Sequence, residues 1–270
     1  MEPRGGHMMQ DVLSVASGSL VGFVLGLVGG GGSIIAVPLL LYVVGIGSTH
    51  LAIGTSAIAV SLSAAANLVN HARNGKVKWP CAATFSAAGI AGAWAGSTLA
   101  MKVPGENLLA LFGALMVVVG TVMLLKKDAE GNPDIRLSIS TARQLLPLLL
   151  AIGFGVGALS GFFGIGGGFL IVPGLMLATG MPIAYAIGTS LVAVAVFGAT
   201  TASNYALSGL VDWRIAGLFV AGGVVGGIAG TFTGKKLGSA KGTLSMIFAI
   251  FVILIGIYVT WKGLAPMLSA

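Results

Sequence analysis

The amino-acid sequence predicts an all-α integral membrane protein made of two homologous repeats, inverted relative to each other. Each repeat is expected to hold a Gly-rich broken or re-entrant helix and three full spans. The chain of 270 residues is 56% hydrophobic and only 8% charged, with a mean hydropathy of +1.03. In a soluble domain about a quarter of the residues are charged. The apolar runs reach about 20 residues, which is the length of a membrane-spanning helix and not of a barrel strand.

A glycine cluster that ends in Val-Pro occurs twice inside apolar sequence, first at 26–38 and again at 161–173. The residues that recur 135 positions later are Gly26, Gly29, Gly31, Gly32, Val37 and Pro38, matched by Gly161, Gly164, Gly166, Gly167, Val172 and Pro173. Two such interrupted segments at matching places indicate the binding site of a repeat-built transporter. Irregular backbone at membrane depth persists only where it is buried in protein or lines a cavity.

The repeat extends beyond the glycines. Ala52–Ser56 returns unchanged as Ala186–Ser190, 134 positions later. The same offset matches Asn70, Gly75, Val77, Trp79, Gly89, Gly92, Gly96 and Lys102 with Asn204, Gly209, Val211, Trp213, Gly223, Gly226, Gly230 and Lys236. Matches over so much of each half indicate an internal duplication.

Each half contains five apolar segments in the same order. In the first repeat, residues 12–125, they are Val12–Val28, Ser33–Val44, His50–Asn70, Trp79–Met101 and Leu108–Leu125. In the second, residues 145–262, they are Leu145–Phe163, Phe169–Thr179, Ile183–Leu207, Trp213–Thr233 and Leu244–Trp261. The second segment of each is too short for a full span, so we expect a half-helix or one arm of a re-entrant hairpin. Residues 1–11 and 263–270 are expected to be tails, and the polar residues 126–144 a cytoplasmic linker.

Loop charges favour inverted halves. The Arg73–Lys78 loop carries three positive charges and its counterpart at Asp212–Arg214 is neutral, whereas the Lys102–Glu106 loop is neutral and its counterpart is basic. With hairpins, ten of the 14 Lys and Arg are cytoplasmic and both termini lie outside. Eight ordinary spans in parallel halves also place ten inside, but leave Lys235, Lys236 and Lys241 on the outer face. That arrangement stays open as the alternative.

The glycine clusters predict an anion site. Residues without Cβ let backbone N–H groups approach a ligand, and a half-helix that begins there directs its N–H groups and partial positive charge at it. The candidate binding residues are Gly29, Gly31, Gly32, Ser33, Gly164, Gly166, Gly167 and Gly168. The alternative is that these glycines only allow close helix packing.

Paired polar residues extend the candidate site. The hydroxyls of Thr55, Ser56, Thr189 and Ser190 could donate hydrogen bonds to an oxyanion, or simply cap helices and bond the i−4 carbonyl. Asn70 and Asn204 are costly in apolar surroundings unless they are satisfied, and interfacial anchoring competes with binding for both.

Other side chains have simpler interpretations. Trp79, Trp213 and Trp261 are expected at the membrane interface, and Cys81 as a small buried apolar residue. His50 precedes the Ala-Ile-Gly-Thr-Ser motif and has no histidine counterpart at Ala184. No Asp or Glu falls within the core of an apolar segment, and no nucleotide-binding or metal-binding spacing occurs. We therefore expect no catalytic residue, metal or cofactor, and a protein that is not an enzyme.

The paired Gly-rich segments with Val-Pro and Ala-Ile-Gly-Thr-Ser resemble the TauE/SafE sulfite exporter family (4-toluene sulfonate uptake-type permeases), from about Val12 to Trp261. The resemblance implies transport of sulfite, sulfonates or related anions across the inner membrane. It points to Gly29, Gly31, Gly32, Thr55, Ser56, Gly164, Gly166, Gly167, Thr189 and Ser190. The halves differ at Gly30/Ile165 and Ser33/Gly168, so the two tips are expected to contribute unequally.

The combined expectation is a multi-pass secondary transporter of the cell inner membrane that exports a small sulfur-containing anion by alternating access. Its partners are this anion and the lipid bilayer, without nucleic acid, and a homodimer is left open. An anion or small-solute channel with a fixed pore is the first alternative. A non-transporting membrane anchor is the second.

Overall fold

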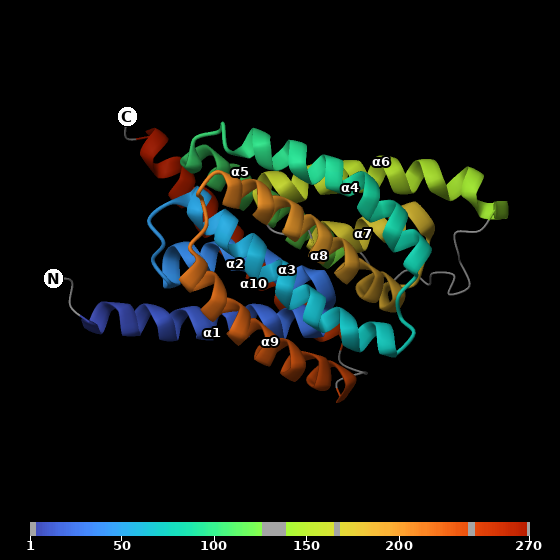
Figure 1. The fold of residues 1–270 in the computed structure, drawn as a ribbon, viewed down its shortest axis with the longest axis horizontal. Helices are drawn as coiled ribbons and strands as arrows, with labels where there is room; N and C mark the ends of the chain where they lie inside the picture. Colours follow the sequence, from blue (N-terminus) through green and yellow to red (C-terminus); the bar gives the residue numbers. More distant parts are fainter. Residues whose placement is uncertain (1–3, 126–138, 165–167, 237–240, 269–270) are drawn as a thin grey trace.

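The computed structural model describes residues 4–125, 139–164, 168–236 and 241–268, and every regular element within them is a helix (Figure 1). The first repeat holds α1 Arg4–Val28, η1 Gly29–Ile35, α2 Ala36–Pro38, η2 Leu39–Val43, α3 Thr49–Arg73, α4 Trp79–Ala100 and α5 Gly105–Leu125. The second holds α6 Ile139–Phe163, α7 Gly168–Thr179, α8 Ile183–Leu207, α9 Trp213–Lys236 and α10 Lys241–Leu268. The all-helical prediction is confirmed over the described residues.

The predicted segments match the helices in order, and some match in their bounds. The segment Ile183–Leu207 coincides with α8, whereas α1 and α6 begin earlier than the apolar runs that predicted them. Helix ends depend on local backbone bonding as well as on hydropathy, so polar residues extend both helices at their starts.

The arm that follows the first glycine cluster is irregular. It passes from the 3₁₀ helix η1 through the three residues of α2 into the π-helix η2. Four consecutive glycines have little helical preference, and Pro38 lacks the N–H that a regular turn would use. The equivalent α7 is an ordinary helix of 12 residues, although Pro173 lies inside it. The two arms therefore differ in helix type.

The main helix pairs cross between the repeats. Helix α1 packs along α9, and its counterpart α6 packs along α4. The backbone of Gly22 lies against Gly223 in the first pair, and that of Gly157 lies against Gly89 in the second. These contacts are equivalent, because Gly22 corresponds to Gly157 and Gly223 to Gly89 at the two sequence offsets. Residues without Cβ allow helices to approach this closely.

The remaining long helices pair with their own counterparts, α3 with α8 and α5 with α10. Gly54 lies against the carbonyl of Leu210, whereas Gly198 lies against Ala57 and Ser61. Residue numbers rise along α3 as they fall along α8, so the two helices are antiparallel. We name the first end of the molecule as the one where α3 begins and α8 ends, and the second end as the opposite one. The start of α1 and the finish of α10 both lie at the first end (Figure 1).

The outer surface suits a bilayer. Among the described residues, six helices are long and apolar enough to cross a membrane, and they are Met8–Leu27, Thr49–Arg73, Gly105–Val122, Thr141–Phe163, Ile183–Leu207 and Trp213–Thr233. Large apolar side chains such as Val118, Phe232 and Leu254 are exposed on the outside. In water such a surface would be costly, whereas lipid solvates it. The protein is a multi-pass membrane protein.

Candidate functional site

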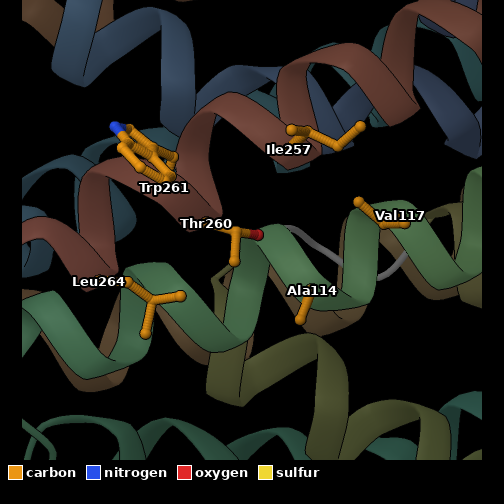
Figure 2. Close-up of a pocket in the computed structure, with 6 residues that line it drawn as sticks. All are labelled: Ala114, Val117, Ile257, Thr260, Trp261 and Leu264. Atoms are coloured by element: carbon orange, nitrogen blue, oxygen red, sulfur yellow. The ribbon is translucent and has the colours of Figure 1, made fainter.

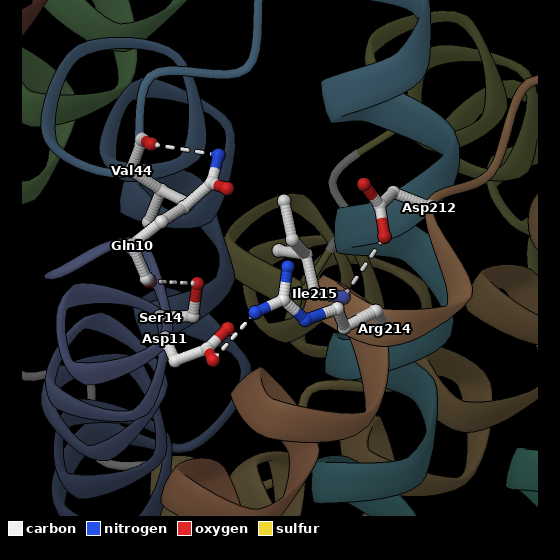
Figure 3. A network of polar contacts seen from close by, with 7 residues as sticks. All are labelled: Gln10, Asp11, Ser14, Val44, Asp212, Arg214 and Ile215. Carbon is white, nitrogen blue, oxygen red and sulfur yellow. Dashed lines mark hydrogen bonds and ion pairs between the residues drawn. The ribbon is translucent and has the colours of Figure 1, made fainter. Parts of the chain in front are cut away.

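The segment that follows the first glycine cluster ends beside the start of α1. Gln10 near the start of α1 donates from Nε2 to the carbonyl of Val44, which follows η2, at 3.3 Å (Figure 3). Asp11, one residue further, forms an ion pair of 2.6 Å with Arg214 at the start of α9. The first contact joins two parts of the first repeat, and the ion pair joins the first repeat to the second at the first end.

The glycine-rich part of this hairpin lies deep in the molecule. Gly32 packs against the backbone of Val21 and Leu25 in α1, and Ser33 is fully buried. Gly29 and Gly31 belong to η1. The arm that follows, Ile34 to Val37, is also buried, and η1 contacts α7 of the second repeat. The two glycine-rich arms therefore meet inside the protein.

The chain turns at Gly164, directly after α6. Its φ of +66° is a left-handed conformation that L residues with a Cβ rarely adopt. The same residue packs against the side chain of Ile53. Its carbonyl accepts a hydrogen bond from Ser56 Oγ at 3.2 Å. The turn of the second hairpin is thereby held against the first two turns of α3. Gly166 and Gly167 lie outside the described residues, and Gly168 is buried at the start of α7.

The two predicted threonine hydroxyls make one bond each across the repeats. Thr55 Oγ1 accepts from the backbone N–H of Asp212 at 3.0 Å, and Thr189 Oγ1 accepts from the backbone N–H of Lys78 at 3.0 Å. Lys78 also places its Nζ 4.5 Å from the centre of the Tyr185 ring. The two threonine bonds lie at opposite ends of the α3–α8 pair. Both acceptors are fully buried.

The adjacent serines point their hydroxyls at helix carbonyls. Ser56 donates to the carbonyl of Ile53 at 2.9 Å as well as to that of Gly164, and Ser190 donates to the carbonyl of Ile187 at 2.8 Å. In this conformation both serine protons are therefore held by backbone oxygens. Binding of an anion by either serine would require its hydroxyl to rotate.

The two predicted asparagines have different surroundings. Asn204 is 7% exposed and donates from Nδ2 to Ser97 Oγ at 2.7 Å and to Thr98 Oγ1 at 2.9 Å, which joins α8 to α4. Asn70 is only partly buried, and its Oδ1 accepts from Asn74. The structure therefore brings Asn204 into the helix interior and leaves Asn70 near the end of α3.

Asn67, one turn before Asn70, holds the buried position in the first repeat. It lies between α3 and α9, with its Oδ1 accepting from Thr231 Oγ1 at 3.4 Å. The interior of α3 also contains Ser61, whose Oγ donates to the carbonyl of Ala195 at 2.6 Å. Sequence reasoning missed both residues because neither has a polar counterpart of the same type at the repeat offset. Thr231 matches Ser97 at the repeat offset, and Ser97 is the partner of Asn204. This match was the signal in the sequence that could have pointed to Asn67.

A cavity of about 390 Å³ lies between α5 and α10, away from the glycine hairpins (Figure 2). Its lining is apolar apart from Thr260, and Trp261 and Ile257 stand at its edge. The Thr260 hydroxyl donates to the carbonyl of Gly256 at 2.7 Å. Since this groove opens on the outer apolar surface, acyl chains of lipid suit it better than an anion does.

The interior chemistry around the hairpins is neutral. It consists of backbone groups, hydroxyls and amides, and among the described residues no three His, Cys, Asp or Glu gather as a metal site. Such a set can replace the hydration shell of an ion with fixed hydrogen bonds.

Comparisons with known proteins place the chain among membrane transporters. A family profile described as "Sulfite exporter TauE/SafE" matches residues 14–259. A "Probable membrane transporter protein" of Xylella fastidiosa strain 9a5c is 47% identical over 258 residues, which cover 96% of this chain and 98% of the relative. The "Probable membrane transporter protein YunE" of Bacillus subtilis is 27% identical over 273 residues, covering 95% and 99%. No solved structure matches the chain significantly.

Proposed function

Because the chain belongs to the TauE/SafE sulfite exporter family of membrane transporters, we propose that it is a secondary transporter that exports sulfite, sulfonates or related organosulfur anions across the inner membrane. The observation that carries the mechanism is the reciprocal packing of the two repeats. Every main helix contact of one half recurs in the other, as between Gly22 and Gly223 and between Gly157 and Gly89. Repeat-built transporters use such symmetry to form two conformations of similar energy.

The repeats are inverted in this proposal. A two-fold rotation that exchanges two antiparallel helices has its axis perpendicular to them. Helices α3 and α8 are counterparts and are antiparallel, so if they cross the bilayer the axis lies in the membrane plane. The excess of positive charge in the Arg73–Lys78 loop favours the second end as the cytoplasmic one.

The anion is held where α7 meets η1. Helix α7 has 12 residues and begins at the buried Gly168, so its first N–H groups and the positive end of its dipole lie inside the protein. Gly32 and Ser33 belong to η1, the element of the first repeat that contacts α7. Backbone donors suit a sulfonate, because they bind several oxygens without a fixed positive charge.

Alternating access follows from the two threonine bonds. Thr55 joins α3 to the start of α9 at the first end, and Thr189 joins α8 to the segment before α4 at the second end. Rocking one repeat against the other would open one end and keep the bond at the other. The membrane potential alone can drive export, since it is worth about 2.3 kcal/mol per charge per 100 mV.

The direct test is counterflow in liposomes that contain the purified protein. Labelled sulfite, taurine or methanesulfonate is placed outside, with the same unlabelled anion inside. We expect saturable uptake that is accelerated by the unlabelled anion. Uptake without saturation or acceleration would indicate a channel, and no uptake of any sulfur anion would refute the proposal.

A further inference from the structure

The first turn of α3 lies at the first end of the molecule and lacks a side-chain cap. Ser48 occupies the N-cap with extended backbone angles of φ −129° and ψ 129°, and its side chain makes no capping hydrogen bond. The first intrahelical bond runs from the N–H of Ala52 to the carbonyl of Ser48 at 3.0 Å. The N–H groups of Thr49, His50 and Leu51 precede it, so they are the donors that a helix start leaves without an intrahelical acceptor.

Two aromatic side chains, one in this turn and one packed next to it, have buried polar atoms without a hydrogen-bond partner. They are the Nδ1 atom of His50 and the hydroxyl of Tyr205. Tyr205 belongs to α8 and is 0% exposed. A buried hydroxyl in an apolar interior is costly when it has no partner, and such groups call for a structural or ligand-based explanation.

The Tyr205 ring extends toward the start of α3. Its Cβ lies against Gly54, one helical turn further into the molecule than His50. Its ring centre is 6.4 Å from that of the imidazole, with an angle of 30° between the planes. The phenol, the imidazole and the free N–H groups of the first turn of α3 therefore gather at one place.

The donors in this group share one chemical preference. A phenol O–H, an imidazole N–H and helix N-terminal N–H groups all donate hydrogen bonds, and the helix dipole adds partial positive charge. Of the acidic side chains described at this end, Asp11 pairs with Arg214 through Oδ2, Asp212 accepts from the N–H of Ile215 at 3.0 Å, and Glu106 is exposed at the start of α5. The complementary ligand is a small oxyanion.

We propose that the first turn of α3, His50 and Tyr205 form an oxyanion-binding site at the first end of the molecule. This site rests on the proposed export function, in which it receives the sulfonate or sulfite released from the interior before it leaves the protein. The repeat offers no copy of it at the second end, since Ala184 and His71 stand at the positions equivalent to His50 and Tyr205. The two ends therefore bind anions differently.

The test compares Tyr205→Phe with wild type in the purified full-length protein. The replacement removes one oxygen that has no partner, so the melting temperature without ligand should stay the same or rise. Binding of sulfite, methanesulfonate, sulfate and acetate is then measured by thermal shift and by calorimetry. Tyr258→Phe is the matched control, because Tyr258 lies on α10 with a half-exposed side chain in edge-to-face contact with Tyr42.

We expect Tyr205→Phe to weaken the Kd for the bound anion about tenfold, which corresponds to about 1.4 kcal/mol, and Tyr258→Phe to leave it unchanged. His50→Ala should weaken the binding of the same anion.

If wild type binds an anion and Tyr205→Phe binds it equally well, the site is refuted while the export function stands. If acetate alone binds in a Tyr205-dependent way and no sulfur anion is transported, the site stands and the substrate assignment fails. If no anion in the panel binds to wild type, the site is refuted.

Discussion

The hydroxyl oxygen of Thr55 accepts a 3.0 Å hydrogen bond from the backbone N–H of Asp212 in the other repeat. The equivalent threonine, Thr189, accepts an equal bond from the N–H of Lys78, which is the residue equivalent to Asp212. Each repeat thus supplies one hydroxyl and one N–H. The identical Gly-Thr-Ser triplets have a structural role that explains why both copies carry the threonine.

Replacing Thr55 with valine should destabilise the protein. Valine keeps the shape but removes the acceptor, so the partly buried N–H of Asp212 loses its partner at a cost of about 1 kcal/mol. The measurement is the melting temperature in detergent. Thr55→Ser, which keeps the hydroxyl, should melt near wild type.

Thr121→Val is the control for this substitution. Thr121 is exposed on α5, and its hydroxyl donates only to the carbonyl of Val117 in its own helix. Its replacement should change the melting temperature little. Equal effects of Thr55→Val and Thr121→Val would mean that the bond between repeats adds nothing to stability.

Gly157→Ala should separate α4 from α6. A Cβ at this position would collide with the backbone of Gly89, which cannot move without shifting the helix. Overpacking of this kind costs about 1–3 kcal/mol. Gly155, on the same helix, has nothing within 4 Å of an added Cβ. Gly155→Ala should therefore be neutral or slightly stabilising, and a loss of stability equal to that of Gly157→Ala would contradict the packing of this pair.

Gly164→Ala should be more damaging than Gly209→Ala. Both glycines have positive φ, +66° and +70°, so alanine at either costs about 1–2 kcal/mol in backbone strain. Only at Gly164 does the new methyl group also meet Ile53, because Gly209 faces open space. A double-mutant cycle with Ile53→Ala isolates the contact. Finding no coupling between the two positions would show that the second hairpin does not rest on α3.

Asn204→Ala should lower stability and Asn70→Ala should not. The first loses hydrogen bonds to Ser97 and Thr98, and interhelical bonds in membranes are worth about 1 kcal/mol. The second removes a partly exposed side chain at the end of α3. The measurement is the melting temperature of each variant. Equal losses would mean that Asn70 and Asn204 contribute equally to stability, which would contradict the prediction.

The fold could be predicted from the sequence because two signals agree. Runs of apolar residues marked the helices, and the offset of 134 or 135 positions aligned the halves closely enough for Ile183–Leu207 to coincide with α8. The pairing of α1 with α9 could not be predicted, since the contact of Gly22 with Gly223 depends on how the halves dock. Local patterns carry no information about such partners.

The candidate site was predictable in composition but not in contacts. The sequence indicated that Thr55 and Thr189 are special, but their acceptor role requires the position of Asp212 and Lys78 in space. It also treated Asn70 and Asn204 as equivalent, whereas a shift of one helical turn places Asn67 in the buried position. Tyr205 has no tyrosine counterpart in the first repeat, so no repeated motif drew attention to it.

The proposed transport mechanism depends most on the inverted relation of the two repeats, and one labelling experiment tests this relation. Asn74 and Ser208 are equivalent exposed residues that follow α3 and α8, and the native Cys81 is buried. Asn74→Cys and Ser208→Cys are each treated in intact cells with a membrane-impermeant maleimide, before and after permeabilisation. We predict that Ser208→Cys reacts in intact cells and that Asn74→Cys reacts only after permeabilisation. Reaction of both cysteines from the same side would contradict the inverted arrangement and the mechanism built on it.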